Sequence, residues 1–204
     1  MLVVTLQASS QILTADEFAK HNIDKYDGIA DKKHQYVQAA EALKDQFALD
    51  KNNQYSKVTI IDCPNMKKDA LYKNVNEWFK KSFADKASTI QRDDAESGVM
   101  IVNTTLKNIV TFPHQLVSVN LIVRIDVKDN KIRLTNTIHH YIINSSTEWQ
   151  VKKCAPFADV QDQLTKKVGS SAYVASCIFA ETAAKKLEEA SKPKVVVDDD
   201  NDDW

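Results

Sequence analysis

Glycine is scarce in this sequence: Gly28, Gly98 and Gly169 are the only three among 204 residues. A protein of average composition has about 7% glycine. Loops that hold phosphates or dinucleotides need several closely spaced glycines, because their backbone must approach the ligand. The composition therefore excludes both kinds of loop.

Cysteine is also scarce, and Cys63, Cys154 and Cys177 show no C-x-x-C spacing. Structural zinc sites usually draw on such closely spaced pairs, so we expect no metal site and no cofactor. No nucleophile or zinc-hydrolase motif such as G-x-S-x-G or H-E-x-x-H occurs either. An oxidising compartment would allow one disulfide among the three cysteines, and each pairing stays open.

An excess of basic charge is missing too, because 27 Lys and Arg residues stand against 28 Asp and Glu, for a formal net charge of -1. Proteins that bind nucleic acid usually need a basic excess, so nucleic acid is not an expected partner. The apolar runs are all too short to span a membrane. With 43% hydrophobic residues, the chain suits one sizeable soluble domain with appendages.

Two stretches, residues 116–127 and 132–143, carry the clearest pattern. In both, apolar and polar residues alternate with the period of two that is typical of a half-buried strand. The apolar positions are Val117, Val119, Leu121, Val123, Ile125 and Val127 in the first stretch, and Ile132, Leu134, Ile138 and Ile142 in the second. A two-residue turn at Asp129 and Asn130 would join the stretches into a hairpin.

This turn determines the expected register of the hairpin. Leu121 lies opposite Ile138, and on the other face Asp126 lies opposite Arg133. An opposite-charge pair of this kind contributes roughly 0.2 to 1 kcal/mol. A slip by one residue would bury Arg133, so the register is well specified. We therefore predict that Leu121 is a core residue and that Asn120, next to it, lies on an exposed polar face.

The polar face of the hairpin is the candidate ligand-binding surface. Its side chains are those of Asn120, Arg124, Arg133, Thr135, Thr137, His139 and Tyr141. Side chains alternate along a strand, so the adjacent His139 and His140 should point to opposite faces, with His139 opposite Asn120 and His140 beside Val119. On that expectation the two imidazoles cannot hold one metal ion together.

The surrounding segments predict an α+β domain. A strand at residues 57–63 is followed by a helix that Asn65 caps, and short strands at 89–91 and 99–106 lead into the hairpin. The apolar face of the helix consists of Leu71, Val75, Trp78, Phe79 and Phe83. The order of strand, helix and four strands is typical of an antiparallel sheet with its helices on one face.

Helical segments flank this domain on both sides. Thr14 to Glu17 form a capping box, and apolar residues recur at helical spacing between residues 31 and 48. A second such stripe predicts a helix from about Ser171 to Ala190 that packs back on the core. The expected units are an N-terminal helical segment (12–54), the central α+β domain (55–145) and a C-terminal helical segment (146–192).

The two ends of the sequence differ in composition from the rest. The largely apolar residues 2–6 are followed by Ala8, Ser9 and Ser10, the small-residue pattern that follows the apolar part of a secretory signal. We expect residues 1–11 to be a signal-peptide remnant, and the protein to be exported to a periplasm or secreted. Residues 193–204 are rich in aspartate, and we expect them to form a disordered acidic tail.

The central stretch resembles a known bacterial family. The residues that carry the resemblance are the run Val58–Ile61, the helical residues 68–72 and 75–79, the block 88–98 and the turn region 127–133. Together they are similar to a family of uncharacterised, mostly exported bacterial proteins, over about residues 55–145. The resemblance implies a TATA-box-binding-protein-like fold. It implies no activity, and the name of the fold implies nothing about DNA binding.

Two kinds of function remain for this sequence. The first is a non-catalytic exported or cell-envelope domain that binds an unknown protein or small molecule through the polar sheet face. The second is an enzyme of hydrolase type with a site assembled from scattered residues, such as His139, Arg133, Asp126 and Tyr141. We favour the first, because catalysis needs a base held by an orienting partner and the sequence shows no such arrangement. The ligand and the oligomeric state do not follow from the sequence.

Overall fold

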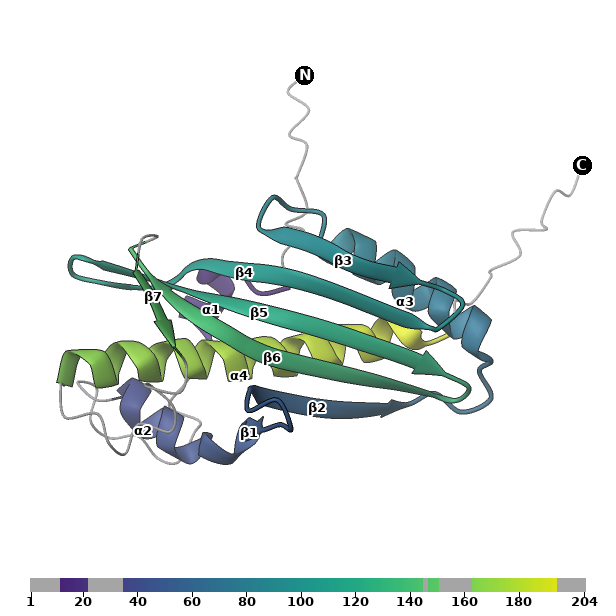
Figure 1. The fold of residues 1–204 in the computed structure, drawn as a ribbon, viewed down its shortest axis with the longest axis horizontal. Helices are drawn as coiled ribbons and strands as arrows, with labels where there is room; N and C mark the ends of the chain where they lie inside the picture. The colour runs from purple at the N-terminus through teal and green to yellow at the C-terminus, as the bar shows by residue number, and fades with distance from the viewer. Residues whose placement is uncertain (1–11, 22–34, 145–146, 151–162, 194–204) are drawn as a thin grey trace, which may run out of the picture.

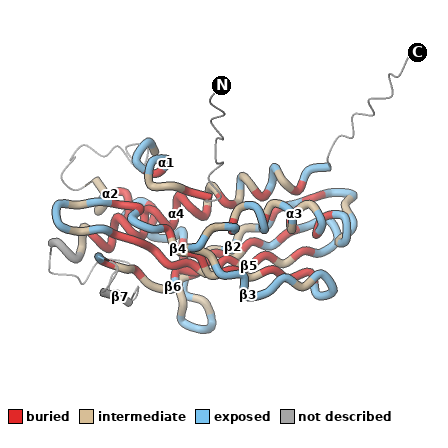
Figure 2. Tube along the Cα trace, turned by 90° about the horizontal axis from the view of Figure 1, so that it is seen from above, coloured by how far each residue is buried: buried red, intermediate tan, exposed pale blue. Residues whose placement is uncertain are grey.

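A computed structural model describes four parts of the chain, residues 12–21, 35–144, 147–150 and 163–193. They form a seven-stranded antiparallel sheet with the helices on one of its two faces (Figure 1). Seen from above, the helices make a layer over the strands (Figure 2). The predicted signal-peptide remnant lies outside the described residues, as does the predicted acidic tail from residue 194 onward.

The strands and helices follow the order that the sequence predicts for the central domain. The strands are β1 (Ala48–Leu49), β2 (Tyr55–Asp62), β3 (Ser88–Asp94), β4 (Val99–Phe112), β5 (Gln115–Lys128), β6 (Lys131–Ile143) and β7 (Thr147–Gln150), and the helices are α1 (Ala15–Lys20), α2 (Gln35–Ala42), α3 (Lys68–Ser82) and α4 (Gln163–Ser191). Across the sheet the strands run β1-β2-β6-β5-β4-β3, and β7 pairs with β6. The predicted α+β order of strand, helix and four strands is confirmed, and β1 and β7 are additions to it.

The β5–β6 hairpin has the predicted register from its turn as far as Ile138. Leu121 lies opposite Ile138, and Asp126 lies opposite Arg133. Asn130 in the turn has a φ of 64°, which asparagine adopts more readily than most residues. The apolar positions of β5 are fully buried on the face that the helices cover. The alternation of the sequence therefore identifies the core face correctly in this part of the hairpin.

Beyond Ile138 the predicted register is wrong, because β6 has a bulge at His139. The pairing with β5 passes from Ile138 to His140 and leaves His139 as an extra residue. One extra residue in a strand reverses the alternation of the side chains that follow it. Tyr141 therefore pairs with Val119 and is buried on the helix-covered face, although the sequence pattern places it on the polar face.

Two further expectations change with the bulge. His140, and not His139, lies opposite Asn120. Ile143 is buried whereas Ile142 is half-buried, the reverse of what strict alternation predicts. The alternation of apolar and polar residues in the sequence cannot reveal a bulge, because the inserted residue can be identified only from the pairing of the two strands.

The turn of the hairpin also positions the start of α3. The carboxylate of Asp129 accepts a hydrogen bond of 2.7 Å from the backbone N–H of Lys68, the first residue of the helix. A carboxylate is favourable there, because the first N–H groups of a helix have no partner within it. The predicted cap by Asn65 is wrong. The backbone of Asn130 bonds to the loop before α3, so turn and helix form one unit.

Gly98, in the turn between β3 and β4, allows this turn to lie against β5. Its carbonyl accepts a hydrogen bond of 2.8 Å from the N–H of Val127, and its φ is 70°. A Cβ atom at this position would lie 2.5 Å from the carbonyl oxygen of Val127. Both the backbone conformation and the close approach therefore require glycine.

α3 packs on the sheet with the apolar face that the sequence predicts. The buried side chains are Leu71, Tyr72, Val75 and Phe79, followed by Phe83 just after the helix. Tyr72, Asn76 and Lys80 all bond to the carboxylate of Asp93 in β3. Burial would raise the pKa of Asp93, but these bonds outweigh it and hold the pKa below its usual value. Helix α3 is thus attached to the edge strand by polar bonds as well as apolar contacts.

α4 is longer than the predicted helix at 171–190 and packs against β2, β4, β5 and β6. Residues 168–180 are all buried, so this part of the helix has no exposed side. The hydroxyl of Tyr173 donates to two backbone carbonyls just after α2, which ties the N-terminal segment to the core. The prediction that this helix packs on the core is confirmed.

No helix in the described ranges is long and apolar enough to cross a membrane.

The N-terminal helices are shorter than the sequence pattern predicts. α1 begins with the predicted capping box, in which the N–H of Glu17 donates to the Thr14 hydroxyl and the N–H of Thr14 donates to the Glu17 carboxylate. α2 ends at Ala42, where the pattern continues to residue 48. A 3-10 turn (Lys44–Gln46) and β1 follow it.

The two described cysteines, Cys63 and Cys177, are buried free thiols. Burial raises the pKa of the Cys177 thiol to about 12, so this thiol is uncharged and unreactive at neutral pH. Cys154 lies outside the described residues. Cys63 and Cys177 are therefore not joined by a disulfide in this structure.

Asn136 is a polar residue on the helix-covered face of β6. It is fully buried between Lys57 of β2 and Val123 of β5. Neither the nitrogen nor the oxygen of its side chain makes a hydrogen bond within the described part of the chain. Leaving a buried polar group without a bond costs roughly 1 to 3 kcal/mol. We therefore expect the side chain of Asn136 to lower the stability of the fold.

We expect Asn136→Leu to raise the free energy of unfolding by roughly 1 to 3 kcal/mol, because leucine has a similar size and needs no hydrogen bond. The midpoint of urea denaturation measures the change. Thr135→Val, one position away on the opposite face, is the control and should change the stability by less than about 0.5 kcal/mol. A destabilised Asn136→Leu variant would show that the amide has a partner.

We also expect Leu121→Ala to lower the free energy of unfolding by roughly 2 to 5 kcal/mol, through lost burial and a cavity. Asn120→Ala should cost roughly 1 to 3 kcal/mol, because the buried amide of Asn120 donates to groups in β4. Arg133→Ala is the exposed control and should cost less than about 1 kcal/mol. If Asn120→Ala were as mild as Arg133→Ala, the observed burial of Asn120 would be contradicted.

Candidate functional site

The face of the sheet opposite the helices, called the open face below, is formed by alternate residues of four strands. Its members are Val58 and Ile60 of β2, Arg133, Thr135 and Thr137 of β6, Asn120, Ile122, Arg124 and Asp126 of β5, and Ile101, Asn103 and Thr105 of β4. The strand register aligns them in rows across the sheet. No helix in the described part of the chain covers this face (Figure 2).

Arg124 and Arg133 share the carboxylate of Asp126 on the open face. Arg124 donates from Nε at 3.0 and 3.1 Å and from Nη2 at 2.7 Å. Arg133 donates from Nε and Nη2 at 3.2 and 3.1 Å. The predicted pair of Asp126 and Arg133 is confirmed, and Arg124 joins it as a second donor. We call these three residues the Arg-Asp-Arg cluster.

The Arg-Asp-Arg cluster presents positive charge to the solvent. The side chain of Asp126 is only 11% exposed, whereas those of Arg124 and Arg133 are 43% and 53% exposed. Burial would raise the pKa of Asp126, but the hydrogen bonds and charges of Arg124 and then Arg133 outweigh it and hold the pKa below its usual value. Two guanidinium groups against one carboxylate leave a surplus of one positive charge. The cluster therefore suits an anionic group of a partner.

Two large apolar side chains lie next to this cluster. Val58 and Ile60 are 57% and 54% exposed. Val58 pairs across the strands with Thr135, and Ile60 pairs with Arg133. The open face thus brings exposed apolar side chains and an arginine together at its β2 side.

Two of the predicted site residues are buried within the open face. Thr137 shares a hydrogen bond of 2.7 Å with Ser56 of β2. The amide of Asn120 donates to Asn103 at 2.7 Å and to Thr105 at 2.9 Å. These side chains bond to neighbouring strands and are not available to a partner. The prediction that Asn120 lies exposed is wrong, because its amide is long enough to reach across to β4.

Of the other predicted residues, Arg124, Arg133 and Thr135 lie together on the open face as expected, and Tyr141 lies on the opposite, buried face. The prediction that His139 and His140 point to opposite faces is wrong. Their Nδ1 atoms are 2.7 Å apart, because the bulge brings the two rings together. His139 is exposed and His140 is half-buried.

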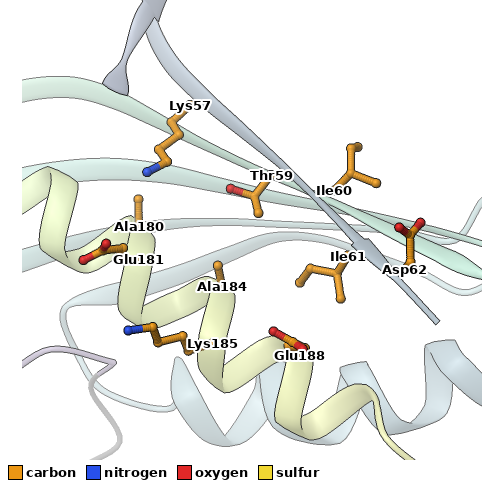
Figure 3. A pocket seen from close by; sticks show the side chains of 10 residues that line it. All are labelled: Lys57, Thr59, Ile60, Ile61, Asp62, Ala180, Glu181, Ala184, Lys185 and Glu188. Atoms are coloured by element: carbon orange, nitrogen blue, oxygen red, sulfur yellow. The ribbon is translucent and has the colours of Figure 1, made fainter. Parts of the chain in front are cut away.

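A pocket of about 460 Å³ lies between β2 and α4, on the other side of β2 from the open face. It is lined by Lys57, Thr59, Ile60, Ile61 and Asp62 of β2 and by Ala180, Glu181, Ala184, Lys185 and Glu188 of α4. Figure 3 shows Ile61 on the α4 side of the strand and Ile60 pointing away from the helix. The lining mixes both signs of charge with small apolar residues, so it selects no single class of ligand.

Sequence reasoning missed Val58 and Ile60 as surface residues. The run Val58–Ile61 has apolar residues on both faces, with Val58 and Ile60 on one and Ile61 on the other, and apolar residues on both faces usually indicate a strand buried on both sides. One feature of the sequence argues against burial on both sides, because the polar residues Lys57 and Thr59 alternate with Val58 and Ile60. The structure places these two polar residues on the face of β2 toward α4. Val58 and Ile60 are exposed because no helix or strand of the described residues covers the open face, and no local pattern in the sequence encodes this.

Comparisons with known proteins address the fold of this chain. Residues 55–141 match the family described as a domain of unknown function (DUF4468) with TBP-like fold. No curated protein matches the sequence.

Two solved structures are similar to this one. A TBP-like protein from Parabacteroides distasonis ATCC 8503 shares 14% identity at a TM-score of 0.59, over 70% of this chain and 95% of its own. A DUF4468 family protein from Bacteroides ovatus ATCC 8483 shares 12% identity at a TM-score of 0.57, over 74% of this chain and 94% of its own. At such identities the likeness shows the fold alone.

These matches agree with the resemblance that the sequence motifs carry, both in the stretch of chain and in the kind of fold. The bacterial sources of the two structures also agree with it. The antiparallel sheet with its helices on one face, described above, independently supports the α+β fold that the resemblance implies. The chain is therefore similar to the DUF4468 family over residues 55–141, and its fold is TBP-like.

Proposed function

We propose that this chain is a non-catalytic binding domain and that a protein partner docks on its open face beside β2. The observation that carries the proposal is the exposure of Val58 and Ile60 next to Arg133. Arginine and large apolar side chains are enriched at the centres of protein interfaces. A partner that covers the two apolar side chains and offers a carboxylate to the Arg-Asp-Arg cluster fits this surface.

The edge of β2 adds a second means of attachment. β1 pairs only with Tyr55 and Ser56, so residues 57–62 have no strand on their outer side within the described part of the chain. The unpaired backbone groups of an edge strand are a template for an extended segment of another chain. Such a segment would gain backbone hydrogen bonds while it covers Val58 and Ile60. This favours a protein partner over a small molecule.

The chemistry of the open face supports binding over the hydrolase alternative. A general base needs a pKa near the working pH, whereas the two arginines hold the pKa of Asp126 below its usual value. Within the described part of the chain, the group beside Nδ1 of His139 is the imidazole of His140 and not an orienting carboxylate. Tyr141, the fourth group of the alternative site, lies on the other face of the sheet.

Site-specific photocrosslinking in the native host tests the proposal. We expect a photoreactive side chain at Val58 to capture one discrete partner, and the same group at Lys73, on the exposed side of α3, to capture none. Adding Ile60→Lys should reduce the captured amount at least tenfold, because a lysine there would lose the apolar contact. Immunoblotting after crosslinking measures both results.

The matched control is Ile90→Lys, which changes an exposed isoleucine on the opposite edge strand, β3. It should leave capture from Val58 unchanged, and both lysine variants should melt as the parent protein does. Equal capture from Lys73, or capture from Val58 that Ile60→Lys does not reduce, would contradict docking at this surface.

We further propose that the protein is exported. The support is in the sequence, where the largely apolar residues 2–6 are followed by Ala8, Ser9 and Ser10. We expect the protein expressed from its native gene to be recovered in a shortened form outside the cytoplasm. Cell fractionation with a cytoplasmic enzyme as marker makes the measurement, and an uncleaved chain that stays with the marker would contradict export.

A further inference from the structure

The outer edge of β2 presents backbone groups that a further strand could use. The N–H of Cys63 donates to the carbonyl of Asn130, the residue just before β6. In an antiparallel sheet, alternate residues of a strand bond to the same neighbour. The N–H and C=O groups of Val58, Ile60 and Asp62 therefore point away from β6. No strand in the described part of the chain pairs with them there.

The pocket of about 460 Å³ between β2 and α4 lies beside the same stretch of β2, on the helix side. Its lining includes Thr59 and Ile61 of β2, and Ala180 and Ala184 of α4. Figure 3 shows the two alanines on the side of α4 that faces β2. Ile61 and Ala180 are buried, so the base of the pocket is apolar.

A strand that pairs with β2 would use the pocket and the open face together. Side chains alternate along a strand, and residues directly opposite one another in a pair point to the same face. The added residues opposite Val58 and Ile60 would thus lie on the open face. Those opposite Thr59 and Ile61 would lie on the helix side, at the pocket. Apolar side chains suit both sets of positions, because each set meets apolar residues of β2.

We infer that the partner contributes an extended, mainly apolar segment that pairs with β2 and places alternate side chains in the pocket. This inference rests on the proposed function, because it specifies which part of the partner docks beside Val58. Taken alone, the mixed lining of the pocket selects no single class of ligand. The unpaired edge beside it favours a peptide, because a peptide backbone can bond along the strand while its side chains fill the pocket.

Photocrosslinking from within the pocket, in the native host, tests the inference. A photoreactive side chain at Ala184 should capture the same partner as one at Val58, on the other face of the sheet. Ala184→Trp should reduce capture from Val58 at least tenfold, because the indole ring would fill the pocket. Glu189→Trp, at an exposed position of α4 outside the pocket, is the matched control and should leave capture unchanged.

A proline at Asp62 tests the backbone pairing separately. Asp62→Pro removes an N–H that points outward and none that bonds to β6, so the sheet itself should tolerate it. It should reduce capture from Val58 roughly threefold or more, through one lost hydrogen bond. Asp62→Ala keeps the N–H and should leave capture unchanged. Thermal melting of each variant shows whether the fold is intact, and the result of Ala184→Trp does not depend on the proline.

The outcomes separate this inference from the proposed function. If Ile60→Lys reduces capture from Val58 but Ala184→Trp and Asp62→Pro do not, docking on the open face stands and pairing with β2 is overturned. Failure of Ala184 to capture the partner would also overturn it. So would a small molecule that native mass spectrometry finds on the parent protein and not on Ala184→Trp, because the pocket would then hold another class of ligand.

Discussion

The burial of one face of the β5–β6 hairpin is the interaction on which the rest of the structure depends. Its apolar side chains, from Leu121 in β5 to Leu134 in β6, are fully buried under the helices. The hairpin turn then supplies Asp129 to the first residue of α3, and Val127 bonds to the turn at Gly98. Because the pairing aligns these groups, a change of register would remove the core and both attachments at once.

The bulge at His139 divides the hairpin into two parts with different roles. On the turn side, strict alternation produces a core face and an open face that carries the Arg-Asp-Arg cluster. On the far side, the inserted residue turns Tyr141 inward, and β7 replaces β2 as the neighbour of β6. A single unpaired residue thus converts a regular strand into one that holds two imidazoles together at the junction.

The open face carries the features on which the proposed binding role rests. Asp126 holds two arginines in place, and the exposed Val58 and Ile60 lie beside one of them. A carboxylate held by two guanidinium groups is a poor proton acceptor, so these contacts make Asp126 a poor general base and favour the proposed binding role over the hydrolase alternative. The likeness to TBP-like structures extends to the fold and not to this chemistry.

The sequence alone determined the hairpin turn, the register near it, the apolar face of α3 and the capping box of α1, because each depends on neighbouring residues or on a regular period. It also placed Arg124 and Arg133 on one face. The tertiary structure decided that Asn120 is buried, that His139 meets His140 and that Val58 is exposed. These outcomes depend on which strands pair although they are far apart in the sequence, and on which face of the sheet the helices cover. Neither produces a periodic pattern in the sequence.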